Sequence, residues 1–567
     1  MHKIFVVSML LCLSLAAVAV PVERSRRNVV LTDGTRVTAT YFGDEHHSWL
    51  LDADGYVLQP AANGKTFVRT TRRAADEQAV ADRRRRAAAA PRRVGSAATA
   101  PLPTTGSPKI PVVLVEFADS TFQVADTPAG VREYYNTFCN GTADGERHAF
   151  SGNYGTIRDY FREQSNGLFT PEFVVIGPVK LPQKASYYGQ DDAHGNKDIL
   201  YPQFRREAIV AATEAYTGSW SDFDNKNKGQ VDLIFFVFAG CGSNTSKQDY
   251  LIWPKESTAS TTVDGIKFAT TGCTSENRAS VNDDGVVVSV RPDGIGVFCH
   301  ELSHALGLPD FYDTNYEAFG MDLWSIMDYG CYAGNGFCPG GYTSYELDFV
   351  GWRELPVITE SGSYTLQPLS RGGSGVKVVN GENADEYYVL ENRQRDGWDR
   401  SICQRDSGML VIHVDFSQAA WNANAVNTAA NHQRMTIIAA NNRYVGTTAS
   451  TDAAEIIKTW SGNLYPFEGN DSLTAHSVPA ATVFTSSGYM RQDINHIRMN
   501  ADKSVSFHFG NDYQVGIASL TPGDGATHPA AAPAGQPQWF SLDGRRLARK
   551  PAAAGIYVCD GRKVALH

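Results

Sequence analysis

Two histidines, a glutamate and an aspartate lie within eleven residues of this chain, at a spacing suited to metal binding. The stretch 300–310 reads His-Glu-Leu-Ser-His-Ala-Leu-Gly-Leu-Pro-Asp. On an α-helix, residues four apart share a face, so the imidazoles of His300 and His304 can bind one ion. Glu301 would then lie beside the ion as a general base. This spacing is typical of zinc peptidases.

A third ligand is expected just after this helix. Gly307 can adopt a backbone conformation with positive φ, which ends a helix and turns the chain back toward the ion. That turn would bring Asp310 to the metal, because a carboxylate oxygen can bind zinc at about 2.0–2.2 Å. Asp313 is within reach of the same turn, but the spacing favours Asp310. The expected metal ligands are therefore His300, His304 and Asp310.

A different plan, in which a downstream glutamate on a second helix binds the zinc, does not fit the spacing. Glu317 lies thirteen residues after His304, which is too close, and the next glutamate, Glu346, is too far. Three protein ligands leave a fourth position for water, whose pKa zinc lowers to about 7. Glu301 would accept the water proton during attack on a peptide carbonyl and then return it to the leaving amine.

A second motif follows these ligands. Residues 324–330 read Trp-Ser-Ile-Met-Asp-Tyr-Gly and look like the methionine turn that lies beneath the zinc in metzincins. With this turn, the His-Glu-x-x-His-x-x-Gly-x-x-Asp pattern and the Leu-Pro-Asp-x-Tyr-Asp continuation over 308–313, the chain resembles the immune inhibitor A family of secreted bacterial metzincin peptidases. Residues 110–117 are similar to the family's first catalytic-domain strand, and residues 391–394 and 408–415 are similar to a segment downstream of its protease domain.

The resemblance covers about residues 110–510 and implies a metzincin-like zinc protease domain that acts on proteins or peptides. Tyr329 matches a position at which some metzincins place a tyrosine that stabilises the tetrahedral intermediate. A catalytic role for Tyr329 is therefore one interpretation, and a buried tyrosine hydrogen-bonded to the backbone is the other. Met327, the methionine of the turn, could equally be an ordinary core residue.

The first nineteen residues are typical of a secretory signal peptide. Lys3 precedes an apolar run over 4–18, and the run ends in the small residues Ala17, Val18 and Ala19. The run is shorter than the roughly 20 residues of a membrane-spanning helix, and no other segment is long and apolar enough. We therefore expect an exported protein, secreted or attached at the cell surface, with no transmembrane anchor.

Nine cysteines are present, of which Cys12 lies in the signal peptide, so eight remain in a compartment that permits disulfides. Pairing cannot be read from sequence, but Cys331 and Cys338 follow the methionine turn and are the preferred local disulfide. Free buried thiols are the alternative. Cys299 is expected to be such a thiol, since a fourth protein ligand next to His300 would block catalysis.

At 567 residues the chain is too long for a single core, and two or three domains are expected. Arginine clusters at 72–73, 83–86 and 92–93 separate an N-terminal module from residue 110. Nucleic-acid binding is one interpretation of such clusters, but an exported chain of formal net charge −10 argues against it. A protease-sensitive linker is expected instead, at which cleavage would activate a zymogen.

The segment 20–107 is thus expected to be a propeptide. It contains no cysteine, which excludes a thiolate from this segment as the group that blocks the zinc. A carboxylate such as Asp44 or Asp52 could block it, or the segment could cover the cleft. Its strand-like pieces span 28–42 and 47–58.

Within the protease domain, residues 156–165 and 201–216 have helical patterning, and residues 231–238 form a continuous apolar strand. The loop 224–229, which begins with Asp224, resembles an acidic calcium loop of relatives. Lysines stand at its third and fifth positions, where calcium requires carboxylate or amide oxygens. This degenerate loop predicts a turn. Calcium beside Zn2+ is possible only elsewhere in the chain, and this loop does not support it.

Short alternating runs between residues 354 and 511 indicate an all-β, sandwich-like companion domain that would brace the protease or bind substrate. Residues 512–538 are a linker rich in Pro, Gly and Ala. The tail 539–567 looks like the C-terminal sorting tails of type nine secretion cargo, which secretion machinery would recognise. A pair of β-hairpins packed on the preceding domain is the alternative.

The expected fold class is therefore α+β, a mixed sheet with an active-site helix followed by the β-rich domain. The expected organisation is a signal peptide (1–19), a propeptide with a basic linker (20–107), the metzincin-like protease domain (108–353), the sandwich-like domain (354–511), a linker (512–538) and a sorting-type tail (539–567). The expected function is that of a secreted zinc endopeptidase. A surface binding or adhesion protein on a protease scaffold is the alternative, and a zinc hydrolase of non-peptide amides a third.

Overall fold

The computed structural model describes most of the chain. The described residues are 17–18, 20–22, 26–61, 63, 65–88, 99–142, 147, 149–192, 196–282, 284–315, 317–403, 407–446, 453–511, 539–541, 546–547, 549–551, 555–559 and 562–566. They belong to two compact units, Met1–Asp512 and Tyr513–His567. Most of the expected signal peptide, arginines 92–93 and the expected linker 512–538 lie outside the described residues.

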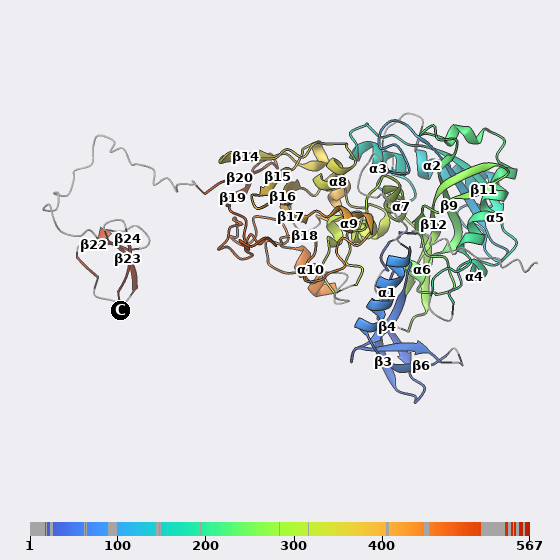
Figure 1. The fold of residues 1–567 in the computed structure, drawn as a ribbon, viewed down its shortest axis with the longest axis horizontal. Helices are drawn as coiled ribbons and strands as arrows, with labels where there is room; N and C mark the ends of the chain where they lie inside the picture. Colours follow the sequence, from blue (N-terminus) through green and yellow to red (C-terminus); the bar gives the residue numbers. More distant parts are fainter. Residues whose placement is uncertain are drawn as a thin grey trace, which may run out of the picture. The chain divides into compact units, whose positions relative to one another are not determined.

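One part of the first unit is built on a mixed sheet, of which β9, β11 and β12 are labelled in Figure 1. Its strand order is β1-β10-β12-β9-β7-β8, and β11 and β13 also pair with β12. The strands are β1 (Ala17–Val18), β7 (Lys109–Glu116), β8 (Glu172–Lys180), β9 (Val231–Cys241), β10 (Lys255–Ser257), β11 (Thr261–Val263), β12 (Ile266–Val281) and β13 (Val287–Pro292). β7, β8, β9 and β12 run parallel, whereas β10 is antiparallel to β12.

The remaining elements of this part are helices. They are α2 (Pro128–Asn140), α3 (Ile157–Gln164), α4 (Ala185–Tyr188), α5 (Tyr201–Ala215), α6 (Ser243–Ser246), α7 (Gly296–Ala305) and α8 (Ser344–Phe349), with the 3-10 turns η2 (Trp220–Phe223), η3 (Asp322–Trp324) and η4 (Tyr329–Gly336). The helices predicted over 156–165 and 201–216 correspond to α3 and α5, and the apolar strand predicted over 231–238 corresponds to β9.

The continuous apolar run of β9 is explained by burial on both faces of the sheet, as in parallel sheets covered by helices. Phe235 and Val237 lie in the core that also contains α7, whereas Phe236 and Phe238 lie in the core that contains α5. Phe235 stacks on Phe298 of α7, with ring centroids 3.7 Å apart. This contact fixes α7, which carries the histidine motif, against the sheet.

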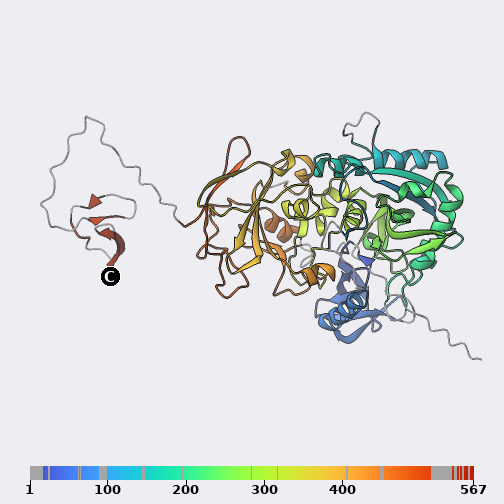
Figure 2. The same ribbon diagram turned by 45° about the horizontal axis from the view of Figure 1, so that its top comes forward.

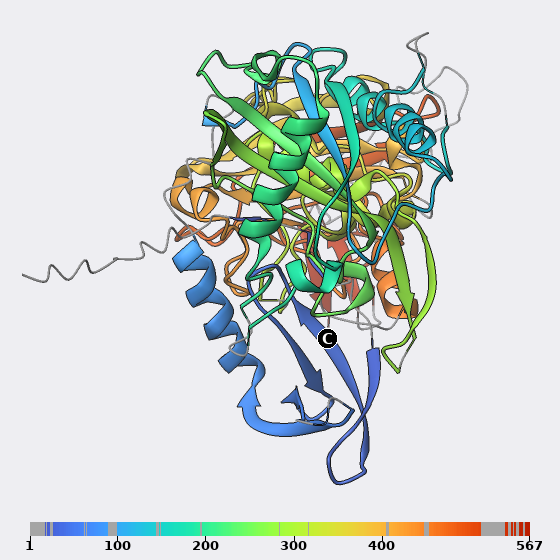
Figure 3. The ribbon, with the colours of Figure 1, turned by 90° about the vertical axis from the view of Figure 1, so that its right-hand side faces the viewer.

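The N-terminal module is a five-stranded antiparallel meander with helix α1 beside it (Figure 3). Its elements are β2 (Arg26–Val30), β3 (Arg36–Gly43), β4 (Ser48–Asp52), β5 (Tyr56–Pro60), β6 (Phe67–Arg73) and α1 (Ala74–Ala88). Residues 83–86, the second arginine cluster, are therefore part of helix α1. Trp253 and Tyr312, from the part that follows, lie in the same core as the strands of this module.

Two further sheets follow the α/β part (Figure 2). One has the order β14-β20-β19 and the other β15-β16-β17-β18. Their strands are β14 (Gly362–Leu366), β19 (Ile494–Met499), β20 (Val505–Phe509), β15 (Val376–Asn380), β16 (Asn383–Arg393), β17 (Gly408–Asp415) and β18 (Met435–Ile437), joined by α9 (Gln418–Asn422), α10 (Ala453–Trp460), η5 (Leu369–Arg371) and η6 (Gly397–Arg400). The two sheets share one hydrophobic core.

The strands β16 and β17 are buried on both faces. Tyr388 and Met409 point into the core between the two sheets. Val389 and Leu410, their neighbours, belong to the core that also contains α7. Strands β16 and β17 thus contribute to both the core between the C-terminal sheets and the core that contains α7.

The second unit is a four-stranded antiparallel sheet in the order β22-β21-β23-β24, made of β21 (Trp539–Phe540), β22 (Arg546–Leu547), β23 (Gly555–Cys559) and β24 (Arg562–Leu566). In the described part of the chain, no helix combines the length and apolar composition needed to cross a membrane.

The preferred disulfide is not present. Cys331 and Cys338 are free buried thiols, and Cys338 Sγ donates to the carbonyl oxygen of Trp398 at 3.5 Å. Cys139, Cys241, Cys273 and Cys299 are also free. The alternative of free buried thiols therefore describes Cys139, Cys273 and Cys299, whereas Cys241 is only partly buried.

Candidate metal centre and active site

Helix α7 places the two motif histidines on one face. His300 and His304 are completely buried, and their ring centroids lie 4.7 Å apart. The helix ends at Ala305, and Gly307 follows with φ of 101°. This is the positive φ expected from the sequence, and it turns the chain back so that Asp310 reaches the histidines.

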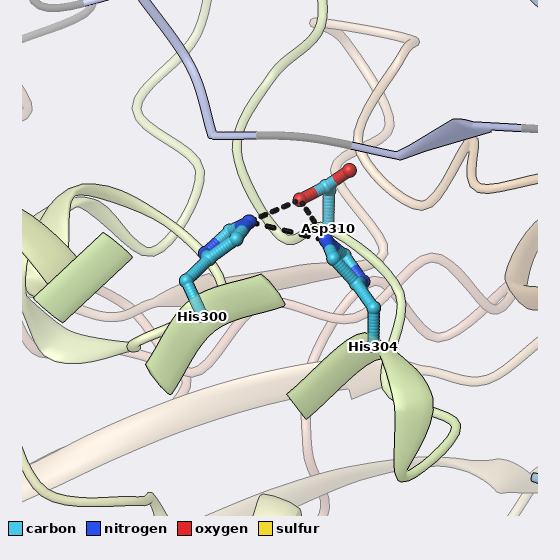
Figure 4. A group of neighbouring side chains, drawn as sticks. All are labelled: His300, His304 and Asp310. Atoms are coloured by element: carbon cyan, nitrogen blue, oxygen red, sulfur yellow. Dashed lines mark hydrogen bonds and ion pairs between the residues drawn. The ribbon is translucent and has the colours of Figure 1, made fainter. Parts of the chain in front are cut away.

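The three side chains converge on one point (Figure 4). Oδ1 of Asp310 lies 3.2 Å from Nε2 of His300 and 3.3 Å from Nε2 of His304, and the two Nε2 atoms are 3.1 Å apart. Ligand atoms at about 2.0–2.1 Å from a tetrahedral zinc ion are about 3.3 Å from one another. The spacing of the donor atoms therefore suits such an ion.

The protonation of the imidazoles also fits a metal. Nδ1 of His300 donates to the carbonyl oxygen of Ile326 at 2.7 Å, and Nδ1 of His304 donates to that of Leu308 at 2.8 Å. With the proton on Nδ1, each neutral imidazole presents a lone pair at Nε2. Two lone pairs and the Oδ1 atom of Asp310, which accepts no hydrogen bond from the described residues, would repel one another without a cation.

The charge state of Asp310 matches this role. Burial acts to raise its pKa, but positive charge beside it, at His304 and His300, outweighs that effect and holds the pKa below its usual value. A metal ion between neutral imidazoles would supply positive charge at the same place. The carboxylate therefore stays ionised, as a metal ligand must be.

Glu301 lies beside these three side chains and is also completely buried. Its Oε1 accepts a hydrogen bond from the backbone N–H of Val20 at 3.2 Å, and its Oε2 has no hydrogen-bond partner among the described residues. Burial, together with the charge of Asp310, raises the pKa of Glu301 well above its usual value. A carboxylate with a raised pKa is suited to accept and return a proton.

The methionine-containing turn lies directly beneath His300. Ile326, whose carbonyl oxygen fixes that imidazole, precedes Met327, which is completely buried in the surrounding core. The hydroxyl of Ser325 accepts from the N–H of Met327 at 3.0 Å and donates to Glu346 at 2.5 Å. Glu346 is therefore a support of the turn and is not among the grouped metal-binding residues.

The N-terminal residues 20–22 lie at this site, and residues 17–18 form strand β1. Strand β1 pairs antiparallel with β10. The carbonyl oxygen of Val20 accepts from Nε1 of Trp253 at 3.1 Å, and that of Pro21 accepts from the hydroxyl of Tyr332 at 2.9 Å. The carbonyl oxygen of Val22 accepts from the hydroxyl of Tyr329 at 2.5 Å.

Trp253 and Tyr332 are site residues that the sequence interpretation missed. Neither lies in a motif, and only the fold brings them to two successive carbonyl groups, those of Val20 and Pro21. The two carboxylates suggested as blocking groups are engaged elsewhere. Oδ1 of Asp44 accepts from the N–H groups of His46 and His47, and Asp52 pairs with Arg69 at 2.7 Å.

The loop at Asp224 is a turn, as predicted. Oδ1 of Asp224 accepts from the N–H of Lys228 at 2.7 Å, and Oδ2 accepts from that of Gly229 at 2.7 Å. The aspartate thus closes its own loop through backbone donors.

Comparison with known proteins identifies the domain that carries the site. Residues 99–353 match the model of the immune inhibitor A peptidase M6 catalytic domain. This segment is an M6 peptidase domain of the immune inhibitor A family. The resemblance seen in the sequence is confirmed. The M6 domain is of the metalloendopeptidase class, which implies a bound metal ion.

The relatives are much longer than the matched region. The chain is 28% identical over 281 residues to immune inhibitor A of Bacillus thuringiensis subsp. alesti, a match that covers 42% of this chain and 39% of that protein. It is 25% identical over 223 residues to the pre-pro-metalloprotease PrtV of Vibrio cholerae serotype O1 (strain M66-2), which covers 35% of this chain and 24% of PrtV. The chain therefore spans less than half the length of either relative.

Proposed function

We propose that this chain is a secreted zinc endopeptidase in which His300, His304 and Asp310 hold the metal and Glu301 moves the proton. The convergence of three buried acceptors 3.1–3.3 Å apart supports this proposal most directly. When bound, zinc supplies Lewis acidity toward water and the scissile carbonyl. A binding-only protein on this scaffold would not require a buried glutamate of raised pKa beside such a cluster.

Glu301 takes the proton from the attacking water as the new C–O bond forms at the peptide carbonyl. It then gives that proton to the nitrogen as the C–N bond breaks, so one carboxylate serves as base and acid. The hydroxyl of Tyr329, which donates to the carbonyl of Val22, is placed to donate to a substrate carbonyl as negative charge develops.

The propeptide assignment, residues 20–107, rests on the segment that crosses the site. Residues 20–22 remain in the chain after removal of residues 1–19, and their carbonyl groups occupy three hydrogen-bond donors at the site, those of Trp253, Tyr332 and Tyr329. The N–H of Val20 also engages Glu301. The intact chain is therefore latent, and cleavage at the arginine clusters allows the N-terminal module to leave.

The remaining domain boundaries are proposed as expected from the sequence. The M6 domain is metzincin-like, with a mixed sheet above the active-site helix, and the two C-terminal sheets form a sandwich-like companion domain over 354–511. Residues 1–19 direct export, and residues 539–567 are a sorting tail. These assignments place the enzyme outside the cell.

A hydrolysis assay tests the proposed reaction. Chain trimmed by an arginine-specific protease should cleave unfolded casein, lose this activity with a zinc chelator and regain it with stoichiometric zinc. A small non-peptide amide run in parallel should remain intact. Cleavage of that amide but not of casein would favour the non-peptide hydrolase, and chelator-insensitive cleavage would contradict a metal mechanism.

A further inference from the structure

The metal-binding carboxylate of Asp310 is held by one side chain from the domain that follows the M6 domain. Nδ2 of Asn424 donates to Oδ2 of Asp310 at 2.6 Å. Oδ1 of the same amide accepts from the backbone N–H of Asp310 at 2.7 Å. Asn424 thus grips Asp310 at two points, and it lies 114 residues further along the chain.

This contact distinguishes the two oxygens of the carboxylate. Oδ2 is occupied by the amide of Asn424, while Oδ1 faces the Nε2 atoms of His300 and His304. A carboxylate fixed in this way offers one oxygen to a metal in a defined direction. Hydrogen bonds that orient a ligand typically change metal affinity by about 10–100-fold when they are removed.

The backbone at Asn424 is adapted to this grip. Its φ is 51°, a left-handed conformation that asparagine and glycine adopt more readily than other residues. It follows α9 (Gln418–Asn422), whose Trp421 is completely buried in the core that also contains α7. The amide is therefore positioned by a packed element.

The neighbouring residues hold the rest of the ligand loop in the same manner. Asn427 Nδ2 donates to the carbonyl oxygen of Phe311 at 2.7 Å. The N–H of Gly320 donates to Gln433 at 2.6 Å, and the carbonyl oxygen of Gly320 accepts from Thr436 at 2.7 Å. Side chains from residues 424–436 thus bind the backbone of Asp310, Phe311 and Gly320.

We infer that Asn424 is a positioning residue for the metal ligand Asp310, and that metal affinity depends on the domain after the M6 domain. The M6 match ends at residue 353, so this requirement lies outside the catalytic domain itself. The inference rests on the proposed zinc site and adds a role for the companion domain that a general brace would not have. Removing Asn424 should weaken zinc binding even if the protein stays folded.

The experiment compares zinc affinities in the full chain. Asn424→Gly removes both hydrogen bonds while keeping a residue that accepts φ of 51°. Asn442→Gly is the matched control, because Asn442 has the same φ of 51° and lies in the same domain. Zinc dissociation constants are measured by competition with a chromophoric chelator, and the thermal midpoint of each metal-free protein reports its fold.

Asn424→Gly should raise the zinc dissociation constant about 10–100-fold, whereas Asn442→Gly should leave it within about twofold of wild type. In an Asp310→Ala background, Asn424→Gly should cause no further loss of zinc affinity, because Asn424 then has no carboxylate ligand to orient. The inference would be overturned if Asn424→Gly bound zinc with wild-type affinity. It would also be overturned if Asn424→Gly weakened zinc binding in the Asp310→Ala background as much as it does in wild type. If wild type binds no zinc, or binds it as well with His300→Ala, the proposed zinc site itself fails.

Discussion

The backbone N–H of Val20 donates a hydrogen bond to Oε1 of Glu301 at 3.2 Å, across 281 positions of sequence. The proposed general base is therefore engaged by the chain's own N-terminal segment. Trp253, Tyr332 and Tyr329 bind the carbonyl groups of the same segment. An extended substrate would compete for these groups, which is why the intact chain is expected to be latent.

Replacing the arginines at 72–73, 83–86 and 92–93 with alanine should keep the secreted protein at its full propeptide length and inactive on casein. Wild type processed by an arginine-specific protease should be active. Immunoblotting and casein hydrolysis, each before and after protease treatment, measure the two effects. Normal maturation of the alanine variant would show that activation occurs elsewhere in the chain.

Tyr329→Phe should lower the kcat of the trimmed enzyme by about 10²-fold and leave KM nearly unchanged, because an oxyanion donor acts mainly in the transition state. The zinc dissociation constant should not change. The same substitution in the intact chain removes the hydrogen bond to Val22, so latency should also weaken. An unchanged kcat would mean that Tyr329 serves only to hold the N-terminal segment.

His304→Ala should weaken zinc binding by at least about 100-fold, since it removes one of three protein ligands. Cys299→Ala, a change to a free buried thiol next to His300, should retain wild-type affinity. Chelator competition on metal-free protein measures both. Loss of zinc from the cysteine variant would indicate a different ligand set.

The stability of the methionine turn should depend on the protonation of Glu346. Burial raises the pKa of this carboxyl to about 7, although Ser325 and Thr343 donate to it. The folded protein thus holds the proton more tightly than the unfolded chain. The resulting stabilisation is full below about pH 4.5 and is lost as the pH rises through 7, a change of about 3 kcal/mol.

Glutamine does not titrate, so Glu346→Gln should not show this loss. The free energy of unfolding of the variant minus that of wild type should therefore rise by about 3 kcal/mol between pH 4.5 and pH 8. Denaturant unfolding at both pH values gives the comparison. Glu360→Gln, at an exposed position, should follow the wild-type profile. If wild type and Glu346→Gln change in parallel with pH, Glu346 does not titrate in this range.

The local sequence was sufficient to predict the parts of the candidate site that lie close together in the chain. His300 and His304 share a helical face, and Gly307 adopts the positive φ that brings Asp310 to them, so the candidate site followed from spacing. Strand β9 could also be predicted, because a strand buried on both faces has a continuous apolar sequence.

Long-range contacts could not be predicted from the sequence. The grip of Asn424 on Asp310 and the approach of Val20 to Glu301 depend on how distant segments pack. The proximity of Cys331 and Cys338 in sequence suggested a disulfide, but both thiols remain free and Cys338 instead contacts the carbonyl of Trp398.

The most direct test of the proposed mechanism is Glu301→Gln in protein trimmed at the arginine clusters, with Glu317→Gln as a control at an exposed glutamate near the motif. Casein hydrolysis and zinc content are measured on the same samples. The mechanism predicts that Glu301→Gln keeps one zinc per chain but loses at least about 10³-fold in kcat, while Glu317→Gln matches wild type. Full activity in zinc-loaded Glu301→Gln would contradict the proposed role of Glu301.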